Sequence, residues 1–209
     1  MTISIFRHAA STLAMAGALG VLSVLAGCAT TSAPRSTTAV APYRDTLDLA
    51  GRIAINYSRD GKQESLSGKF TWRQTAANTD VTLISPTGQT VAVINVTPTS
   101  ATLKRSGEPT RTASDLDSLT RQTLGWTLPV SGLRDWLQGY AVAADGSRFS
   151  ASPASDTVVT RDGWKLDYVS WQDDSAAVPQ PKRIDVTRIA LGQQVDDMSI
   201  RIVIDPAAQ

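Results

Sequence analysis

The chain has 209 residues, of which 42% are hydrophobic and 19% are charged, and its 20 lysines and arginines oppose 19 aspartates and glutamates. A nearly neutral protein has no electrostatic reason to bind nucleic acid or to adhere strongly to anionic lipid headgroups. One histidine, His8, and one cysteine, Cys28, are too few for a zinc site built on these two residue types.

The first 28 residues have the layout of a bacterial secretory signal peptide. Arg7 precedes an apolar run from Leu13 to Leu25, and small residues follow up to Cys28. The run is shorter than the roughly 20 apolar residues that a transmembrane helix needs. Because Leu-Ala-Gly directly precedes Cys28, the segment resembles a lipobox, at which the cysteine thiol is acylated. We expect residues 1–27 to be a cleaved signal peptide; a membrane anchor with an incidental cysteine, or an ordinary secreted protein, is the alternative.

Cleavage before a lipidated Cys28 excludes further classes of catalytic site. Removing Arg7 from the 20 basic residues leaves 19 against 19 acidic ones, and His8 is lost as well. Neither Ser-His-Asp nor Cys-His catalysis is then possible, and no disulfide can form within the chain. Three acyl chains on Cys28 exceed the two hydrophobic signals that stable anchoring requires, so we expect the protein to stay on a membrane.

Residues 28–43 are predicted to be a lipidated flexible tether. They are small and polar, with two prolines and runs of serine and threonine, and they carry too little apolar surface to fold. The folded domain is therefore expected in residues 44–209, where some 160 residues can bury a sizeable core.

Apolar residues alternate with polar ones through much of this domain, which predicts β-strands with one buried face. Asp-Gly, Ser-Gly and Pro-Thr-Gly turn signals separate the runs, so we expect an antiparallel sheet curled into a sandwich or barrel. The alternating apolar positions are Ile53, Ile55, Tyr57; Leu66, Gly68, Phe70, Trp72; Trp164, Leu166, Tyr168; Ile184, Val186; and Ile200, Ile202, Ile204.

Two short amphipathic helices are predicted to interrupt the strands. Ser114 and Asp117 open the first, which Gly125 ends; Ser131 caps the second, which Gly139 ends. We expect both helices to cover the concave side of the sheet. Their apolar faces are Leu116, Leu119, Leu124 and Trp126 in the first, and Leu133, Trp136 and Leu137 in the second.

One set of apolar side chains is expected to face the interior between sheet and helices. A close-packed core explains the set, and so does a cavity for an apolar ligand, because barrels of about eight strands can hold one small molecule. The set comprises Phe70, Trp72, Leu83, Leu133, Trp136, Leu137, Trp164 and Tyr168.

A series of short motifs runs in order along the domain, at residues 51–53, 68–72, 85–88, 124–130, 133–139, 163–168 and 179–188. Their order resembles the family of the outer-membrane lipoprotein receptor LolB. The resemblance implies a mainly β fold, an unclosed antiparallel β-barrel with helices capping a hydrophobic cavity. It also implies a non-enzymatic, monomeric protein without metal or cofactor, which accepts acylated lipoproteins from the periplasmic carrier LolA and places them in the outer membrane. Ala29, rather than aspartate, follows the lipidated cysteine, which implies the same membrane.

One turn departs from that family. The loop that corresponds to residues 85–88 usually carries an exposed leucine, thought to aid membrane insertion, where this chain has Thr87. Either a neighbouring residue replaces the leucine or the insertion step is weaker. Pro86, Thr87 and Gly88 are the candidate membrane-facing loop, although an ordinary turn explains them equally well.

Two other functions compete with lipoprotein transfer. A structural or assembly lipoprotein of the outer membrane would share the lipobox and strands but would need no ligand-sized cavity. A cell-wall hydrolase would need paired carboxylates. Its candidates lie in polar, turn-like stretches, where solvated charges are the commoner interpretation: Glu64, Glu108, Asp173-Asp174 and Asp196-Asp197.

Overall fold

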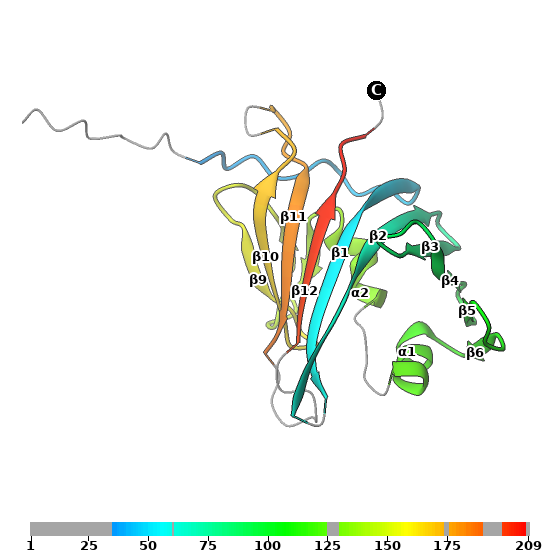
Figure 1. Cartoon of the computed structure of the whole chain (residues 1–209). Helices are drawn as coiled ribbons and strands as arrows, with labels where there is room; N and C mark the ends of the chain where they lie inside the picture. Colours follow the sequence, from blue (N-terminus) through cyan, green and yellow to red (C-terminus); the bar gives the residue numbers. More distant parts are fainter. Residues whose placement is uncertain (1–34, 60, 125–129, 174–175, 190–197, 208–209) are drawn as a thin grey trace, which may run out of the picture. The chain divides into compact units, whose positions relative to one another are not determined.

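A ten-stranded antiparallel sheet, a separate two-stranded hairpin and two short helices make up the regular structure (Figure 1). The computed structural model describes residues 35–207 except residue 60 and residues 125–129, 174–175 and 190–197. The predicted signal peptide and the lipidation site at Cys28 lie outside these described residues.

The large sheet has the strand order β6-β5-β4-β3-β2-β1-β12-β11-β10-β9. Its outermost strands, β6 and β9, do not pair with each other in the described part of the chain, so the sheet curves around α2 without closing (Figure 1). This confirms the predicted fold class. The strands are β1 (Leu47–Arg59), β2 (Lys62–Gln74), β3 (Thr79–Ile84), β4 (Thr90–Val96), β5 (Ala101–Arg105), β6 (Arg111–Ala113), β9 (Thr157–Val159), β10 (Trp164–Trp171), β11 (Pro181–Arg188) and β12 (Ser199–Ile204). The hairpin consists of β7 (Tyr140–Val142) and β8 (Arg148–Ser150).

Alternation in the sequence fixes the two faces of the sheet. In β12, Ile200, Ile202 and Ile204 are buried, whereas Arg201 between them is exposed. Leu66 is the exception, because half of its surface (50%) is exposed although it lies opposite buried Ile55. The pairing of β2 with β3 stops at Lys69, so Leu66 has a strand neighbour on one side only.

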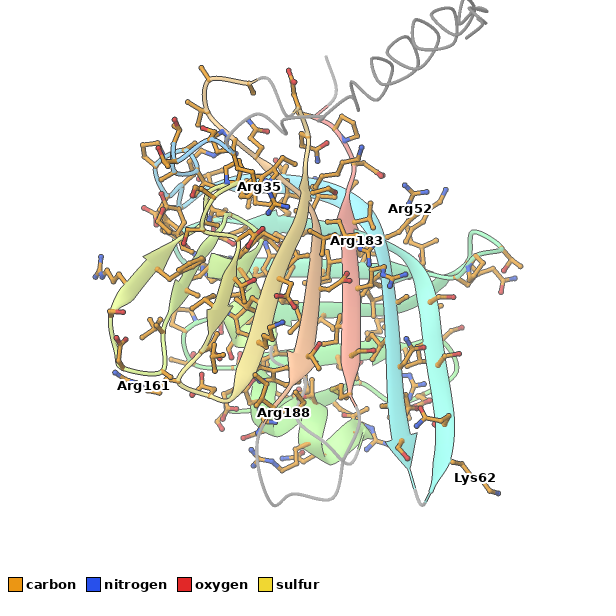
Figure 2. All side chains as sticks on the ribbon, turned by 90° about the vertical axis from the view of Figure 1, so that its left-hand side faces the viewer. Arg35, Arg52, Lys62, Arg161, Arg183 and Arg188 are labelled. Carbon is orange, nitrogen blue, oxygen red and sulfur yellow. The ribbon has the colours of Figure 1, made fainter. Side chains whose placement is uncertain are left out.

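The outer face of the sheet carries mainly polar side chains, with exposed valines such as Val93 and Val159 among them. Figure 2 looks onto this face, where Arg52 of β1 and Arg183 of β11 are labelled. Arg52 forms an ion pair with Asp205, and Arg183 forms one with Asp185. The hydrophobic core therefore lies on the inner face alone.

Helix α1 (Leu116–Leu124) begins one residue later than Ser114 would place it. Its N-cap is Asp115, whose carboxylate accepts a hydrogen bond from the backbone N–H of Ser118 at 2.7 Å and another from the Ser118 hydroxyl at 2.8 Å. The predicted capping by Ser114 and Asp117 is wrong, because Asp115 is an equally good cap and stands next to the first helical residue. The predicted end at Gly125 and the predicted contact of Trp126 lie outside the described residues.

Helix α2 (Val130–Trp136) contains Ser131 instead of being capped by it. The Ser131 hydroxyl donates to the carboxylate of Asp117 at 3.3 Å, and so links the two helices. The predicted end at Gly139 is confirmed, since Gly139 has a φ of +87° and its N–H donates to the carbonyl of Trp136.

Residues 35–46, which we call the strap, lie against the folded unit. Val40 is buried (6% exposed), and its N–H donates to the carbonyl of Ala151 at 3.0 Å. Arg35 forms an ion pair with Asp156 at 2.7 Å. The predicted flexible tether is therefore too long by at least residues 35–43. One valine that fits against Gly139, together with backbone hydrogen bonds, orders a segment that its composition predicts to be unfolded.

Candidate functional site

The structure brings together all eight residues predicted to face the interior. Seven are buried in one hydrophobic cluster on the inner face of the sheet, and Leu83 is half-buried and packs against it. We call this set the apolar cluster: Phe70, Trp72, Leu83, Leu133, Trp136, Leu137, Trp164 and Tyr168.

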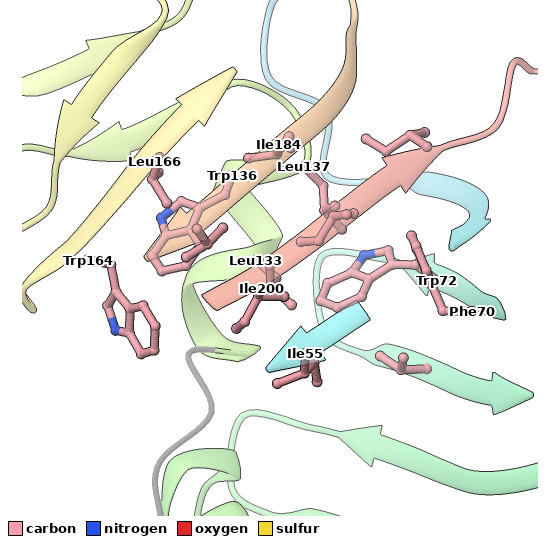
Figure 3. Packing of buried hydrophobic residues seen from close by; sticks show 14 of the residues in the cluster. Ile55, Phe70, Trp72, Leu133, Trp136, Leu137, Trp164, Leu166, Ile184 and Ile200 are labelled. Atoms are coloured by element: carbon pink, nitrogen blue, oxygen red, sulfur yellow. The ribbon is translucent and has the colours of Figure 1, made fainter. Parts of the chain in front are cut away.

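Helix α2 and the residue after it supply the middle of the apolar cluster. Leu133, Trp136 and Leu137 have the spacing i, i+3, i+4, which places them on one helical face. In Figure 3 they lie between Trp164 of β10 on one side and Phe70 and Trp72 of β2 on the other. The helix thus occupies the space that the curved sheet surrounds.

Aromatic contacts hold Trp136 in place. Its ring lies 6.4 Å from that of Trp164, and its carbonyl accepts a hydrogen bond from the hydroxyl of Tyr168 at 3.1 Å. The Arg188 guanidinium stacks over Trp164, 4.9 Å from the ring centre. Burial, and secondarily the carboxylate of Asp135, raise the pKa of Tyr168, which therefore stays a neutral hydrogen-bond donor.

Polar residues of α2 and of the turn after it tie this helix to its surroundings. The guanidinium of Arg134 donates to the carbonyl of Thr75 at 2.7 Å and to the hydroxyl of Thr79 at 3.0 Å, between β2 and β3. The side chain of Gln138 accepts from the N–H of Arg44 and donates to its carbonyl. Sequence reasoning missed these anchors, although Arg134 and Gln138 lie within the segment 133–139 that it singled out.

The strap is also connected to the tryptophan on β2. The indole N–H of Trp72 donates to the side chain of buried Gln74 at 3.1 Å, and Gln74 donates to the hydroxyl of Tyr43 at 3.1 Å. Burial raises the pKa of Asp135 of α2, and the nearby hydroxyl of Tyr43 opposes this rise. The strap, α2 and β2 therefore share one polar network at the border of the apolar cluster.

Two open clefts border the apolar cluster. The larger, which we call the strap cleft, has a volume of about 1280 Å³ and is walled by the strap, the start of β1 and the end of β12. Of the eight predicted residues only Trp72 and Leu137 reach its wall. A second cleft of about 260 Å³ touches Trp136 from the side of Asp135 and Arg161. The remaining cluster residues contact one another instead of either cleft.

The candidate membrane-facing loop is an exposed turn between β3 and β4. The N–H of Gly88 donates to the carbonyl of Ser85 at 2.9 Å, Gly88 has a φ of +88°, and the hydroxyls of Ser85 and Thr87 are hydrogen-bonded at 2.8 Å. A β-bulge follows, because Ile84 pairs with Thr90 while Leu83 pairs with Ala92. The extra residue, Val91, is 44% exposed, so an apolar side chain stands beside the turn that lacks a leucine.

The carboxylates considered for hydrolysis do not form a described pair. The side chain of Glu64 is hydrogen-bonded to the hydroxyl of Tyr57, and Glu108 is ion-paired with Arg105 at 3.1 Å. Asp174, Asp196 and Asp197 lie outside the described residues. Within the described ranges no three His, Cys, Asp or Glu side chains gather as metal ligands would. Nor does any helix in those ranges have the length and apolar character needed to cross a membrane.

Comparison with known proteins identifies close relatives over most of the chain. Residues 45–206 match the family model for the outer membrane lipoprotein LolB. The outer-membrane lipoprotein LolB of Cupriavidus metallidurans is 39% identical over 188 residues, covering 87% of this chain and 90% of that protein. Those of Cupriavidus necator and Ralstonia nicotianae are 38% and 34% identical, and each comparison covers 90% of this chain and 93% of the relative.

Proposed function

This chain belongs to the LolB family of outer-membrane lipoproteins, and we propose that it accepts lipoproteins from the periplasmic carrier LolA and passes them to the outer membrane. It holds their acyl chains against the apolar cluster during the transfer. One chain supplies all eight cluster residues, so the proposed binding of acyl chains needs no second copy.

The observation that carries this proposal is the arrangement of α2 in the curved sheet. A seven-residue helix fills the apolar interior, and polar contacts at Arg134 and Gln138 fasten it at its border. Three acyl chains in water would cost tens of kcal/mol at about 0.8 kcal/mol for each methylene, so a carrier must cover them. Displacement of α2 would expose a surface of leucine, phenylalanine and tryptophan side chains suited to that task.

The transfer needs no bond chemistry. A ligand moves between hosts only along differences in affinity, so this chain must bind acyl chains more tightly than LolA and less tightly than the bilayer. The sequence contains no G-x-x-x-x-G-K-[ST] phosphate loop, in keeping with a handover that uses no nucleotide. The proposed role is therefore that of a lipoprotein-localisation factor, which hands over its cargo without making or breaking a bond.

We also assign the turn Pro86, Thr87 and Gly88 to the outer membrane side. The turn and the neighbouring Val91 are exposed at the tip of the β3–β4 hairpin. Val91 is the neighbour that offers apolar surface in place of the family's leucine.

Transfer of a labelled lipoprotein from purified LolA to the purified protein tests the proposal. The unmodified protein should take up the lipoprotein, and Trp136→Ala and Trp164→Ala should bind a fluorescent acyl probe more weakly per folded molecule. Because such core substitutions cost roughly 3–5 kcal/mol of stability, thermal melting must be measured on the same samples. Trp136→Phe keeps an aromatic ring at this position, and Val169→Ala on the exposed part of β10 is the matched surface control.

Two results would contradict the proposal. Failure of the unmodified protein to take up lipoprotein would favour a structural lipoprotein of the outer membrane. Unchanged acyl binding per folded molecule in both tryptophan variants would show that the apolar cluster is only a core.

A further inference from the structure

We infer that the strap cleft binds the polypeptide segment that follows the acylated cysteine of a cargo lipoprotein, as an extended strand along the free edge of β1. The inference rests on the proposed function and assigns a second, peptide-binding part to the same site. Three observations carry it: an open strand edge, an unsatisfied hydrogen-bond acceptor, and walls shared with the apolar cluster.

The first four residues of β1 have a neighbouring strand on one side only. β1 pairs with β2 from Leu47 onward, but its pairing with β12 starts at Gly51. The carbonyl of Ala50 accepts from the N–H of Asp205 at 2.9 Å, so Ala50 directs its backbone groups toward the β12 side. In an antiparallel ladder every second residue does so, and Asp48 therefore presents its N–H and C=O in the same direction. The described residues offer these two groups no backbone partner.

The position of Pro206 explains why β12 ends before it covers this edge. Extending the β1–β12 ladder would place Pro206 opposite Leu49, and proline, whose ring fixes its backbone φ, is tolerated mainly at strand ends. Residues 204–207 instead form one wall of the strap cleft, and Leu47–Ala50 form another. An extended peptide entering between these walls would meet the free edge of β1, which is how peptides add a strand to a sheet.

The second observation is the side chain of Gln172, which also lines the strap cleft. Its amide nitrogen donates to the carbonyl of Ile204 at 2.9 Å and to that of Pro181 at 3.4 Å, which fixes the orientation of the amide. Its Oε1 is then the one buried side-chain atom in the described part of the chain that lacks a hydrogen-bond partner. Buried polar atoms are almost always paired, so this acceptor calls for an N–H donor.

The chemistry of these groups selects the ligand. Acyl chains carry no N–H, whereas a peptide segment carries one on nearly every residue. The strap cleft shares Trp72 and Leu137 with the apolar cluster, so a ligand can place its lipid in the cluster and its peptide in the cleft. A lipoprotein has both parts joined at its first residue, and a phospholipid has no peptide. The cleft would thus favour lipoproteins over membrane lipids.

Two substitutions remove the proposed peptide contacts separately. Gln172→Met deletes the free acceptor at similar volume, and Asp48→Pro deletes the N–H on the free edge of β1 while leaving the ladder with β2, which uses the alternate residues. Asp48→Ala is the control for Asp48→Pro, because it removes the ion pair with Arg73 but keeps the N–H. Gln63→Met is the control for Gln172→Met, since Gln63 is exposed on β2 and does not line the cleft.

The probes are a synthetic triacylated lipopeptide and a fluorescent fatty acid, titrated into the full chain. We expect Gln172→Met and Asp48→Pro each to weaken lipopeptide binding about three- to tenfold, as the loss of one hydrogen bond implies. Fatty-acid binding should stay unchanged in both, and both controls should bind both probes like the unmodified protein.

Unchanged lipopeptide affinity in both variants would overturn the inference while leaving the proposed function intact. Equal weakening of lipopeptide and fatty acid would also overturn it, because the substitutions would then act on the acyl site or the fold. If the unmodified protein bound neither probe, the proposed function itself would fail.

Discussion

At residue scale, the proposed membrane-facing turn places polar Thr87 near the exposed side chain of Val91. The turn around Thr87 is held by its own hydrogen bonds, and residues 86–88 are exposed, so a change of the Thr87 side chain leaves the fold intact. We expect Thr87→Leu to speed delivery of a labelled lipoprotein into liposomes without altering its uptake from LolA. A leucine side chain gains about 1.5–3 kcal/mol on leaving water, and a threonine gains far less.

Polar substitutions at the same hairpin should slow delivery. Thr87→Glu introduces a carboxylate that must be desolvated at the membrane, and Val91→Ser removes the exposed apolar side chain. Val169→Ser is the matched control, because Val169 is 51% exposed on β10, away from this turn. Equal delivery by the leucine, threonine and glutamate forms would show that the turn does not insert into the membrane.

Two aspartates near the helices predict opposite responses of stability to pH. Burial raises the pKa of Asp135 above its ordinary value of 3.8, although the Tyr43 hydroxyl and the nearby Arg134 and Arg148 oppose the shift. The folded state therefore favours protonated Asp135, and this contribution to stability is present at low pH and lost as pH rises through the raised pKa. Asp135→Asn does not titrate, so its melting temperature should increase relative to that of the unmodified protein between about pH 3 and pH 7.

The pH dependence of stability that Asp115 contributes has the opposite sign. Hydrogen bonds from the Ser118 N–H and hydroxyl lower its pKa, so its contribution to stability is present above pH 3.8 and is lost as pH falls. Asp115→Asn should therefore become less stable relative to the unmodified protein as pH rises over the same range. Parallel trends for Asp115→Asn and Asp135→Asn would contradict the assignment of both groups.

At the scale of elements, the packing of the strap predicts that a substitution within it will destabilise the protein, which the composition of the strap would not suggest. Val40 is buried against Gly139, and an added Cβ on that glycine would lie 2.7 Å from a Val40 methyl carbon. Val40→Ala should cost about 2 kcal/mol and lower the melting temperature by roughly 4–8 °C. Val159→Ala, at an exposed position of β9, should leave it unchanged. An unchanged melting temperature for Val40→Ala would show that the strap is not part of the cooperative fold.

The helices and strands also show which features of the fold can be predicted from the sequence. Alternation at Ile200, Ile202 and Ile204 predicts a buried strand face because the period of two is a local property of a strand. The first helix start is uncertain by one residue, since Ser114 and Asp115 are both good caps and only the position of Leu116 decides between them. The order of the strap depends on a contact between residues 99 positions apart, Val40 and Gly139, which no local pattern encodes.

In the candidate site, too, some features could be predicted from local sequence patterns and others could not. Helical and strand periods predict that Trp136 and Trp164 share one apolar cluster, and the structure places them 6.4 Å apart. The β1–β12 ladder ends at Ile204, opposite Gly51, so the first residues of β1 have no partner on that side. The free edge at Asp48 and the unsatisfied oxygen of Gln172 both depend on this pairing of strands from the two ends of the chain. Such positions cannot be identified before the register of the terminal strands is known.

At the scale of the whole molecule, few residues connect the predicted lipid attachment site to the folded unit. The unit starts at Arg35, seven residues after Cys28. At about 3.3–3.6 Å per residue the connection spans at most about 25 Å, against about 55 Å for a tether that ended at residue 43. An acylated Cys28 would therefore keep the start of the strap close to the membrane surface, where cargo must be delivered.

Replacing the predicted lipid attachment site tests this arrangement. Cys28→Ala should yield a chain that is unprocessed or released from the membrane, because the three acyl chains are the only anchor that the mature sequence predicts. Mass spectrometry of the mature N-terminus should find triacylated Cys28 in the unmodified protein and no lipid in the variant. Ala29→Ser keeps the thiol and is the control for processing, whereas Ala29→Asp should move the protein from the outer to the inner membrane. An unmodified Cys28 in the mature protein would contradict the lipid anchor. A transfer assay with the released Cys28→Ala chain would show whether the folded unit accepts lipoproteins without being held at a membrane.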